Sequence, residues 1–242
     1  MTGWNTWAIG KIGHQAVMMT SKPIAKYRDF IERHKLLPVF VNELAKDAKI
    51  LEVGCGNGRW TRRLLKLGYT DIFSFDSSRE LIKMIDREKL GRRFAVIDMY
   101  DIAADTNLFD AALLLNVIPH GNHERLHAVM IEVEHSLKQN GKIILMDEFI
   151  QQDIREISSI MSSLGFNLKS ISNVNSEAAH KIFNFFVRRS KAEAAGSIKT
   201  YGKTSLKHYL KILFEFPIDI ILSPLLKNTD IFSGKIIVFE RQ

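Results

Sequence analysis

Apolar residues in the middle of the chain alternate between short continuous runs and stretches with helical spacing. Continuous runs are typical of strands buried on both faces of a parallel sheet. Helical spacing is most regular after position 123, where it is typical of a helix packed on a sheet face. The predicted strands are 50–53, 71–76, 94–99, 109–117 including its following loop, 141–147 and 168–174, and the predicted helices are 59–67, 78–90, 123–138 and 151–164. This alternation predicts an α/β fold with a mostly parallel sheet and helices on both faces.

The region before this core, residues 1–47, is predicted to be a helical extension. Ser21 with Pro23 is a suitable helix start, and Pro38 is expected to restart a second short helix. The aromatic residues of the region, among them Trp4 and Trp7, either form a flap over a ligand or pack on the core.

Two segments compete for the last strand, 182–188 and 235–240. The second is favoured because the turn residues Ser233 and Gly234 precede it. On that choice a mostly helical insertion precedes the last strand. The predicted parts are a helical cap at 1–47, the core at 48–175, a basic and apolar insertion at 176–232 and the C-terminal strand at 233–242.

A three-glycine turn follows the first predicted strand, with Gly54, Gly56 and Gly58 spaced as G-x-G-x-G and preceded by Glu52. Glycine permits positive φ and lets a ligand approach the backbone closely. The dinucleotide fingerprint has different spacing, G-x-G-x-x-G, and seats a pyrophosphate. The acid and the shorter spacing therefore indicate a nucleotide-type cofactor that has an ammonium group and no phosphate.

The run from Glu52 to Gly58 resembles motif I of the class I S-adenosylmethionine-dependent methyltransferases, and the later elements follow in that family's order over about residues 48–175. The resemblance implies a Rossmann-like seven-stranded sheet and S-adenosylmethionine as cofactor. It further implies that Asp76, 24 residues after Glu52, binds the ribose hydroxyls.

The same resemblance assigns the remaining cofactor contacts. The Glu52 carboxylate would accept a hydrogen bond from the cofactor's ammonium group, either directly or through a water molecule. Asp98 would contact the adenine amine, with Asp101 as a neighbouring alternative. The residues predicted to bind the cofactor are Glu52, Gly54, Cys55, Gly56, Gly58, Asp76, Ser77, Asp98, Met99 (packed on the adenine), Asn116 and Val117.

Candidate catalytic chemistry lies in the loop after the fourth predicted strand. His120 is either a general base for a hydroxyl acceptor or a structural residue. The loop lacks the Asn/Asp-Pro-Pro-aromatic motif of enzymes that methylate base amines, which argues against that chemistry. Cys55 lies in the cofactor turn and is interpreted as structural rather than as a nucleophile. His123 and His127 share one helix face without an evident third ligand, so no metal site is predicted.

Charge is concentrated in the insertion. Residues 176–211 hold eight basic and two acidic side chains, which is +6 of the formal +7 of the 242-residue chain. With the apolar run at 212–222, this segment could meet an anionic lipid surface, a phosphate-bearing substrate or nucleic acid, or form a solvated lid. A single cysteine, no signal-peptide pattern and no long apolar stretch predict a cytoplasmic protein without a membrane span, with peripheral membrane contact left open.

These observations predict methyl transfer from S-adenosylmethionine to an oxygen or nitrogen of a small-molecule, glycan or lipid-linked acceptor. RNA methylation is the first alternative, favoured by the basic insertion although no RNA-binding module is recognisable. A non-catalytic subunit that binds the cofactor and recruits a partner is the second.

Overall fold

The computed structural model describes residues 22–85, 90, 94–102, 107–119, 121–149, 151–174, 206–222 and 234–242. The chain divides into two compact units. The core unit comprises residues 40–171 and 235–242, and the cap unit comprises residues 1–39 and 172–234. Of the predicted insertion at 176–232, only residues 206–222 are described.

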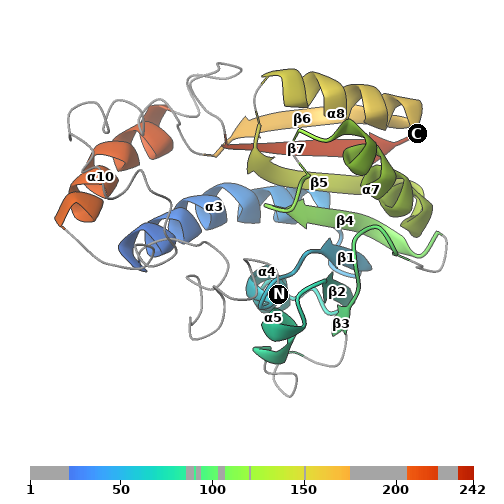
Figure 1. Cartoon of the computed structure of the whole chain (residues 1–242), viewed down its shortest axis with the longest axis horizontal. Helices are drawn as coiled ribbons and strands as arrows, with labels where there is room; N and C mark the ends of the chain where they lie inside the picture. Colours follow the sequence, from blue (N-terminus) through green and yellow to red (C-terminus); the bar gives the residue numbers. More distant parts are fainter. Residues whose placement is uncertain are drawn as a thin grey trace. The chain divides into compact units, whose positions relative to one another are not determined.

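Seven strands form one sheet with the order β3-β2-β1-β4-β5-β7-β6 (Figure 1). β1 pairs in parallel with β2 and β4, β2 with β3, and β4 with β5. β7 runs antiparallel to β6, because Val174 N donates to Gly234 O and Gln242 N donates to Gly165 O. The strands are β1 Ile50–Val53, β2 Ile72–Asp76, β3 Phe94–Val96, β4 Phe109–Leu115, β5 Leu137–Glu148, β6 Phe166–Asn173 and β7 Gly234–Arg241. The predicted seven-stranded α/β fold and the choice of the last strand are confirmed.

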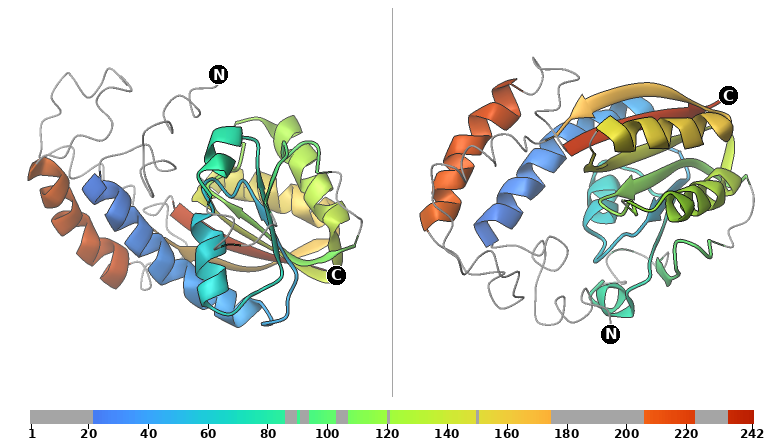
Figure 2. Two further views of the ribbon diagram at one scale, coloured as in Figure 1. Left: turned by 90° about the horizontal axis from the view of Figure 1, so that it is seen from below. Right: turned by 45° about the horizontal axis from the view of Figure 1, so that its top comes forward.

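Helices cover both faces of the sheet (Figure 2). The main core forms between one face and helices α7 and α8, whose buried residues pack with alternate strand residues such as Leu51, Val53 and Leu114. The intervening strand positions, including Glu52, face the other side, where α4 lies. The helices are α3 Lys22–Glu43, α4 Arg59–Lys66, α5 Arg79–Lys83, α7 His123–Ser136, α8 Gln151–Ser163, α10 Leu206–Pro217 and the π-helical turn η2 Ile218–Leu222. Within the described ranges, none of them is both long and apolar enough to cross a lipid bilayer.

The predicted break at Pro38 is wrong. α3 continues through this residue as one helix from Lys22 to Glu43. A proline inside a helix removes one backbone hydrogen bond and costs about 3 kcal/mol. Leu36 and Phe40, on either side of Pro38, are both fully buried, and the burial of such side chains offsets that cost.

The predicted helix at 78–90 is also too long, since α5 ends at Lys83; residues 86–89 lie outside the described part of the chain. The helix predicted to reach 138 ends at Ser136, because Leu137 is already extended and begins β5.

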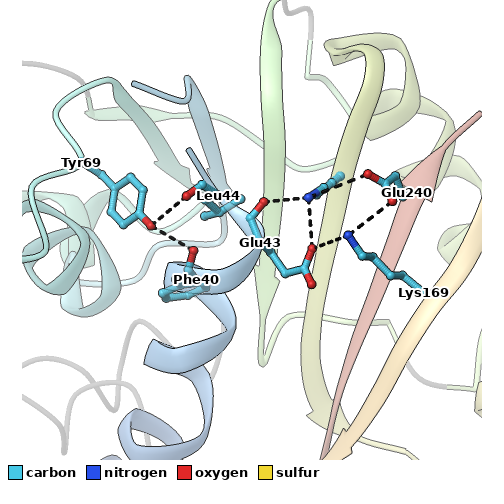
Figure 3. Close-up of polar contacts among 7 residues, drawn as sticks. Phe40, Glu43, Leu44, Tyr69, Lys169 and Glu240 are labelled. Atoms are coloured by element: carbon cyan, nitrogen blue, oxygen red, sulfur yellow. Dashed lines mark hydrogen bonds and ion pairs between the residues drawn. The ribbon is translucent and has the colours of Figure 1, made fainter. Parts of the chain in front are cut away.

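The C-terminal end of α3 is held in the core unit by two groups of polar contacts (Figure 3). Tyr69 Oη donates to the carbonyl oxygens of Phe40 and Leu44, at 2.9 and 3.3 Å. Lys142 Nζ donates to Glu43 O at 2.8 Å and also pairs with the Glu43 carboxylate at 3.1 Å. The last carbonyl groups of a helix lack hydrogen-bond donors within the helix. Tyr69 and Lys142 provide donors for the carbonyl groups at this end of α3.

The Glu43 carboxylate belongs to a four-residue ion-pair cluster. Lys169 Nζ lies 2.9 Å from Glu43 Oε2, and Lys142 and Lys169 both approach Glu240. Burial acts to raise the pKa of Glu43, but hydrogen bonds and charge from Lys169 and Lys142 bring the net pKa below its usual value. The cluster joins the end of α3 to β5, β6 and β7.

Candidate functional site

The predicted site residues gather where neighbouring parallel strands end. Val53 lies beside Phe75 of β2 and beside Leu114 of β4. The residues that follow, Gly54 and Asp76, therefore come to the same edge of the sheet, together with the loop after β4. This carboxyl edge is where open α/β sheets bind ligands.

The turn after β1 requires glycine at three positions. Gly54, Gly56 and Gly58 have φ values of 68°, 58° and 76°, in the left-handed region that residues with a Cβ rarely adopt. Gly58 is the N-cap of α4, and no side chain caps that end of the helix. The turn thus presents its backbone directly at the start of a helix.

Asp76 ties this turn to the end of β2. Its Oδ2 accepts from Gly56 N at 2.9 Å, and its Oδ1 accepts from Ser78 N at 2.8 Å. Burial raises the pKa of Asp76, and the two backbone N–H groups lower it in part. A carboxylate oxygen can accept two hydrogen bonds, so each oxygen has capacity for a further donor such as a ribose hydroxyl. Ser78 caps α5 through its own Oγ, which leaves Asp76 available for a ligand.

The loop after β4 packs directly on the glycine turn. A Cβ added at Gly54 would lie 2.3 Å from Val117 Cγ1, which leaves no space for a side chain. Asn116 has φ 62°, and its N–H donates to Met146 O at 2.6 Å. Non-glycine residues with positive φ are uncommon and concentrate at functional sites. Val117 and Asn116 therefore lie at the site, as the sequence predicts, although no bound cofactor tests their contacts.

Glu52 lies beneath the turn and points away from solvent, with 2% of its surface exposed. Its Oε2 accepts from the hydroxyl of Thr61 on α4 and, at 3.0 Å, from the hydroxyl of Ser74 on β2. Burial raises the pKa of Glu52 to about 7, against the opposing effect of these two hydrogen bonds and of Arg59 and Arg62. The carboxyl thus anchors α4 to the sheet, and its contact with a cofactor ammonium group stays a prediction.

Replacing Glu52 by glutamine is expected to remove a pH dependence of stability. The folded pKa lies near 7 and the unfolded value near 4.5, so the folded state binds the proton more tightly. The stabilisation that comes from this tighter proton binding is full below about pH 4.5 and is lost as pH rises through about 7, a change on the order of 3 kcal/mol. Urea unfolding without cofactor should therefore show that wild type loses more stability than Glu52→Gln between pH 5 and 8.

The exposed Glu124 provides the matched control, because Glu124→Gln should leave the pH dependence of wild type unchanged. Parallel stability curves for wild type and Glu52→Gln would contradict the assignment of a buried, shifted carboxyl at position 52.

Cys55 is buried in the turn, and its N–H donates to Phe75 O at 2.9 Å. Burial, followed by the nearby carboxylates of Glu52 and Asp76, raises the pKa of its thiol far above the usual value. A nucleophilic cysteine needs a thiolate, so this environment favours the structural interpretation.

The other predicted cofactor residues lie farther from the turn or make only local contacts. Asp98 is exposed, and its Oδ1 accepts from Tyr100 N at 3.2 Å within a turn two residues beyond β3. Met99 is partly buried against the main core. Ser77 is exposed next to Asp76. The roles of Asp98 and Met99 at the adenine stay predictions.

His120 lies outside the described residues, so its predicted role as a base stays untested by the structure. His123 stacks with His127 at 6.3 Å between ring centroids, and its Nδ1 lies 2.7 Å from Glu156 Oε1. In the part of the chain that the structure describes, no group of three His, Cys, Asp or Glu side chains is arranged to hold a metal ion.

Three positioning residues were missed from the sequence. Thr61 and Ser74 bind Glu52, and Asp147 accepts from Ile118 N at 3.1 Å, which fixes the loop after β4. Asp147 ends a continuous apolar run, as Asp76 does, so its position at a strand end was an available signal. Thr61 and Ser74 offer no such signal, because their role depends on how α4 packs on the sheet.

Comparison with known proteins agrees with this geometry. Residues 50–141, which include the turn and the loop after β4, match the family model described as "Methyltransferase domain". A tRNA U34 carboxymethyltransferase from Campylobacter fetus subsp. fetus (strain 82-40) is 26% identical over 153 residues, which is 61% of this chain and 50% of that protein. The chain thus matches about half the length of this curated relative.

Solved structures share the fold at low identity. Magnesium protoporphyrin IX methyltransferase from Synechocystis PCC 6803, solved with bound S-adenosylmethionine, superposes with a TM-score of 0.57 at 15% identity, covering 100% of this chain and 92% of that one. A S-adenosylmethionine-dependent methyltransferase from Archaeoglobus fulgidus gives 0.56 at 13% identity, covering 89% and 94%.

Proposed function

We propose that this chain is a class I S-adenosylmethionine-dependent methyltransferase that methylates an oxygen or nitrogen of a small-molecule, glycan or lipid-linked acceptor; the match of residues 50–141 to the methyltransferase domain and the shared fold support the proposal. The proposed cofactor is S-adenosylmethionine, which is bound in the solved structure of the Synechocystis enzyme that shares the fold. The observation that carries the proposal is the meeting of Gly54, Asp76 and Val117 at one edge of the sheet. The Asp76 carboxylate can accept further hydrogen bonds there, and it lies beside the glycine turn, where the three glycines have no side chains. This arrangement fits a nucleoside with free ribose hydroxyls.

The residues present suit that cofactor. It supplies a methyl group that is already activated as part of a sulfonium. The chain must therefore hold the acceptor in line, exclude water and, where the acceptor needs it, remove a proton. Asp76 would accept from the ribose hydroxyls, while its bonds to Gly56 N and Ser78 N keep the carboxylate oriented. His120 remains our candidate for removing the acceptor's proton.

An RNA acceptor is the second candidate. The relative from Campylobacter fetus is named for tRNA, and residues 176–211 carry +6 of the formal net charge of +7 of the chain. A basic segment supports binding to phosphates without specifying sequence. The low identity and the partial match keep this candidate behind the first.

Transfer of a labelled methyl group separates the candidates. The full chain would be incubated with methyl-labelled S-adenosylmethionine and cell extract, which is then divided into aqueous small molecules, lipids, glycans and RNA. We expect label in one of the first three fractions. Label that ribonuclease removes would favour the RNA candidate, and calorimetric binding of the cofactor without transfer to any fraction would favour a non-catalytic subunit. Absence of cofactor binding would contradict the proposal altogether.

A further inference from the structure

The polarity of α10 and η2 is inverted relative to an ordinary surface helix. The residues that they bury are acidic: Asp219 is 1% exposed and Glu215 6%. Six large apolar residues are instead exposed, with Leu213 at 73% and Ile221 at 60%. We call these exposed residues the α10 apolar face; they are Tyr209, Leu210, Leu213, Phe214, Phe216 and Ile221.

Polar contacts inside the cap unit fix this orientation. Tyr27 Oη of α3 donates to Asp219 Oδ2 at 2.6 Å, and the pair is buried. Lys211 Nζ lies 3.6 Å from Glu215 Oε1, and both side chains are largely buried. α10 and this part of α3 lie side by side in both views of Figure 2. Rotating α10 to bury its apolar face would take two carboxyl groups away from these partners, which is costly for buried acids.

Such a face is unusual on a protein surface. Scattered apolar residues are normal, but six large exposed ones between residues 209 and 221 of α10 and η2 are a concentration that indicates an interaction site. Aromatic residues, here Tyr209, Phe214 and Phe216, are common where proteins meet the bilayer interface. The π-helical turn η2 that closes the segment is a rare element found often at functional sites.

The charges around the face indicate what covers it. Lys199, Lys203, Lys207 and Lys211 recur every four residues up to and into α10. Between residues 194 and 222 the acids are Glu215 and Asp219, and both are buried. In the sequence, a run of lysines therefore leads into the segment that holds the exposed apolar and aromatic residues, a composition typical of helices that lie in the interface of a bilayer with anionic lipids.

We propose that the α10 apolar face docks on an anionic lipid bilayer, with the lysines that precede it binding the lipid headgroups. This surface goes beyond the proposed methyl transfer, since it requires neither cofactor nor acceptor. Lys211 pairs with Glu215 in the structure, so we assign the headgroup contacts to the lysines that precede it in the sequence.

Sedimentation of the full chain with lipid vesicles tests the proposal. We expect binding to phosphatidylcholine vesicles that contain phosphatidylglycerol, weak binding to phosphatidylcholine alone, and a decrease with added salt. Leu213→Asp with Ile221→Asp should lower the partition coefficient about tenfold or more. Lys203→Glu with Lys207→Glu should lower it comparably while leaving the apolar face intact.

Leu168→Asp is the matched control, because Leu168 is also exposed but lies on β6. It should bind vesicles as wild type does. Circular dichroism and calorimetry with S-adenosylhomocysteine check that each variant remains folded, since the predicted cofactor residues belong to the core unit.

Three results would overturn the proposal. The first is vesicle binding that is equal for wild type and Leu213→Asp/Ile221→Asp. The second is a concentration-dependent dimer that these two substitutions dissociate, which would assign the face to a second copy of the chain. The third is salt-sensitive RNA binding that these substitutions abolish, without any vesicle binding by wild type. None of these results depends on methyl transfer, so failure here and failure of the proposed function are distinguishable.

Discussion

Asp76→Ala is expected to weaken S-adenosylmethionine binding by roughly 10- to 100-fold, as measured by calorimetry. The Asp76 carboxylate is partly buried and already oriented by Gly56 N and Ser78 N, so little is lost in ordering it when a ribose hydroxyl donates to it. Hydrogen bonds to charged groups contribute about 1.5–3 kcal/mol, which corresponds to that loss of affinity. Asp76→Asn should bind better than Asp76→Ala but below wild type, because one oxygen acceptor remains.

The control for this variant is Asp47→Ala, at an exposed position outside the turn, which should bind the cofactor as wild type does. Thermal unfolding without cofactor would show how much of the loss comes from the turn itself, since Asp76 also holds Gly56. Undiminished binding by Asp76→Ala would reject the ribose assignment.

Gly54→Ala is expected to damage the site through shape alone. The positive φ of Gly54 costs about 1–2 kcal/mol for a residue with a Cβ. The added methyl group would also lie 2.3 Å from Val117 Cγ1, and such overpacking costs about 1–3 kcal/mol more. We therefore expect a combined penalty of about 2–5 kcal/mol, divided between lower stability in urea unfolding and lower cofactor affinity in calorimetry.

Gly68→Ala separates the two causes. Gly68 has φ 91° and no atom within 4 Å of an added Cβ, so alanine there carries only the backbone cost. Combining Gly54→Ala with Val117→Ala should recover part of the loss, because the shorter side chain removes the closest contact. Equal effects of Gly54→Ala and Gly68→Ala, with no recovery in the double variant, would show that the contact with Val117 is unimportant.

The core of the fold was predictable because its signals are local. Strands β1 and β4 and the 143–146 part of β5 are buried on both faces, so each appears in the sequence as a mostly apolar run. The three glycines and Asp76 follow such runs directly, and their positive φ values and contacts agree with the turn expected there. Residues whose position follows from a strand end were therefore found.

Features that depend on packing between distant elements were not predictable. Nothing in the spacing of Thr61 and Ser74 indicates that both bind Glu52. The insertion that contains α10 was expected to be mostly helical, yet the sequence could not show that Glu215 and Asp219 form the buried side of that helix and of η2. A helix break at Pro38 was predicted because proline disfavours helix interiors. The helix continues through Pro38 because the side chains around it are buried.

The position of β7 has a consequence for the order of events during synthesis. β7, Gly234–Arg241, lies between β5 and β6, although it is the last of the seven strands of this sheet to be synthesised. Strands β1 to β5 can pair as they emerge, but β6 borders β7 in the sheet and gains this partner only once β7 has emerged. Until then β6 and the outer edge of β5 present unpaired backbone groups, the kind of edge to which other chains add. A nascent chain stalled before residue 234 should therefore be the form of this protein most dependent on chaperones.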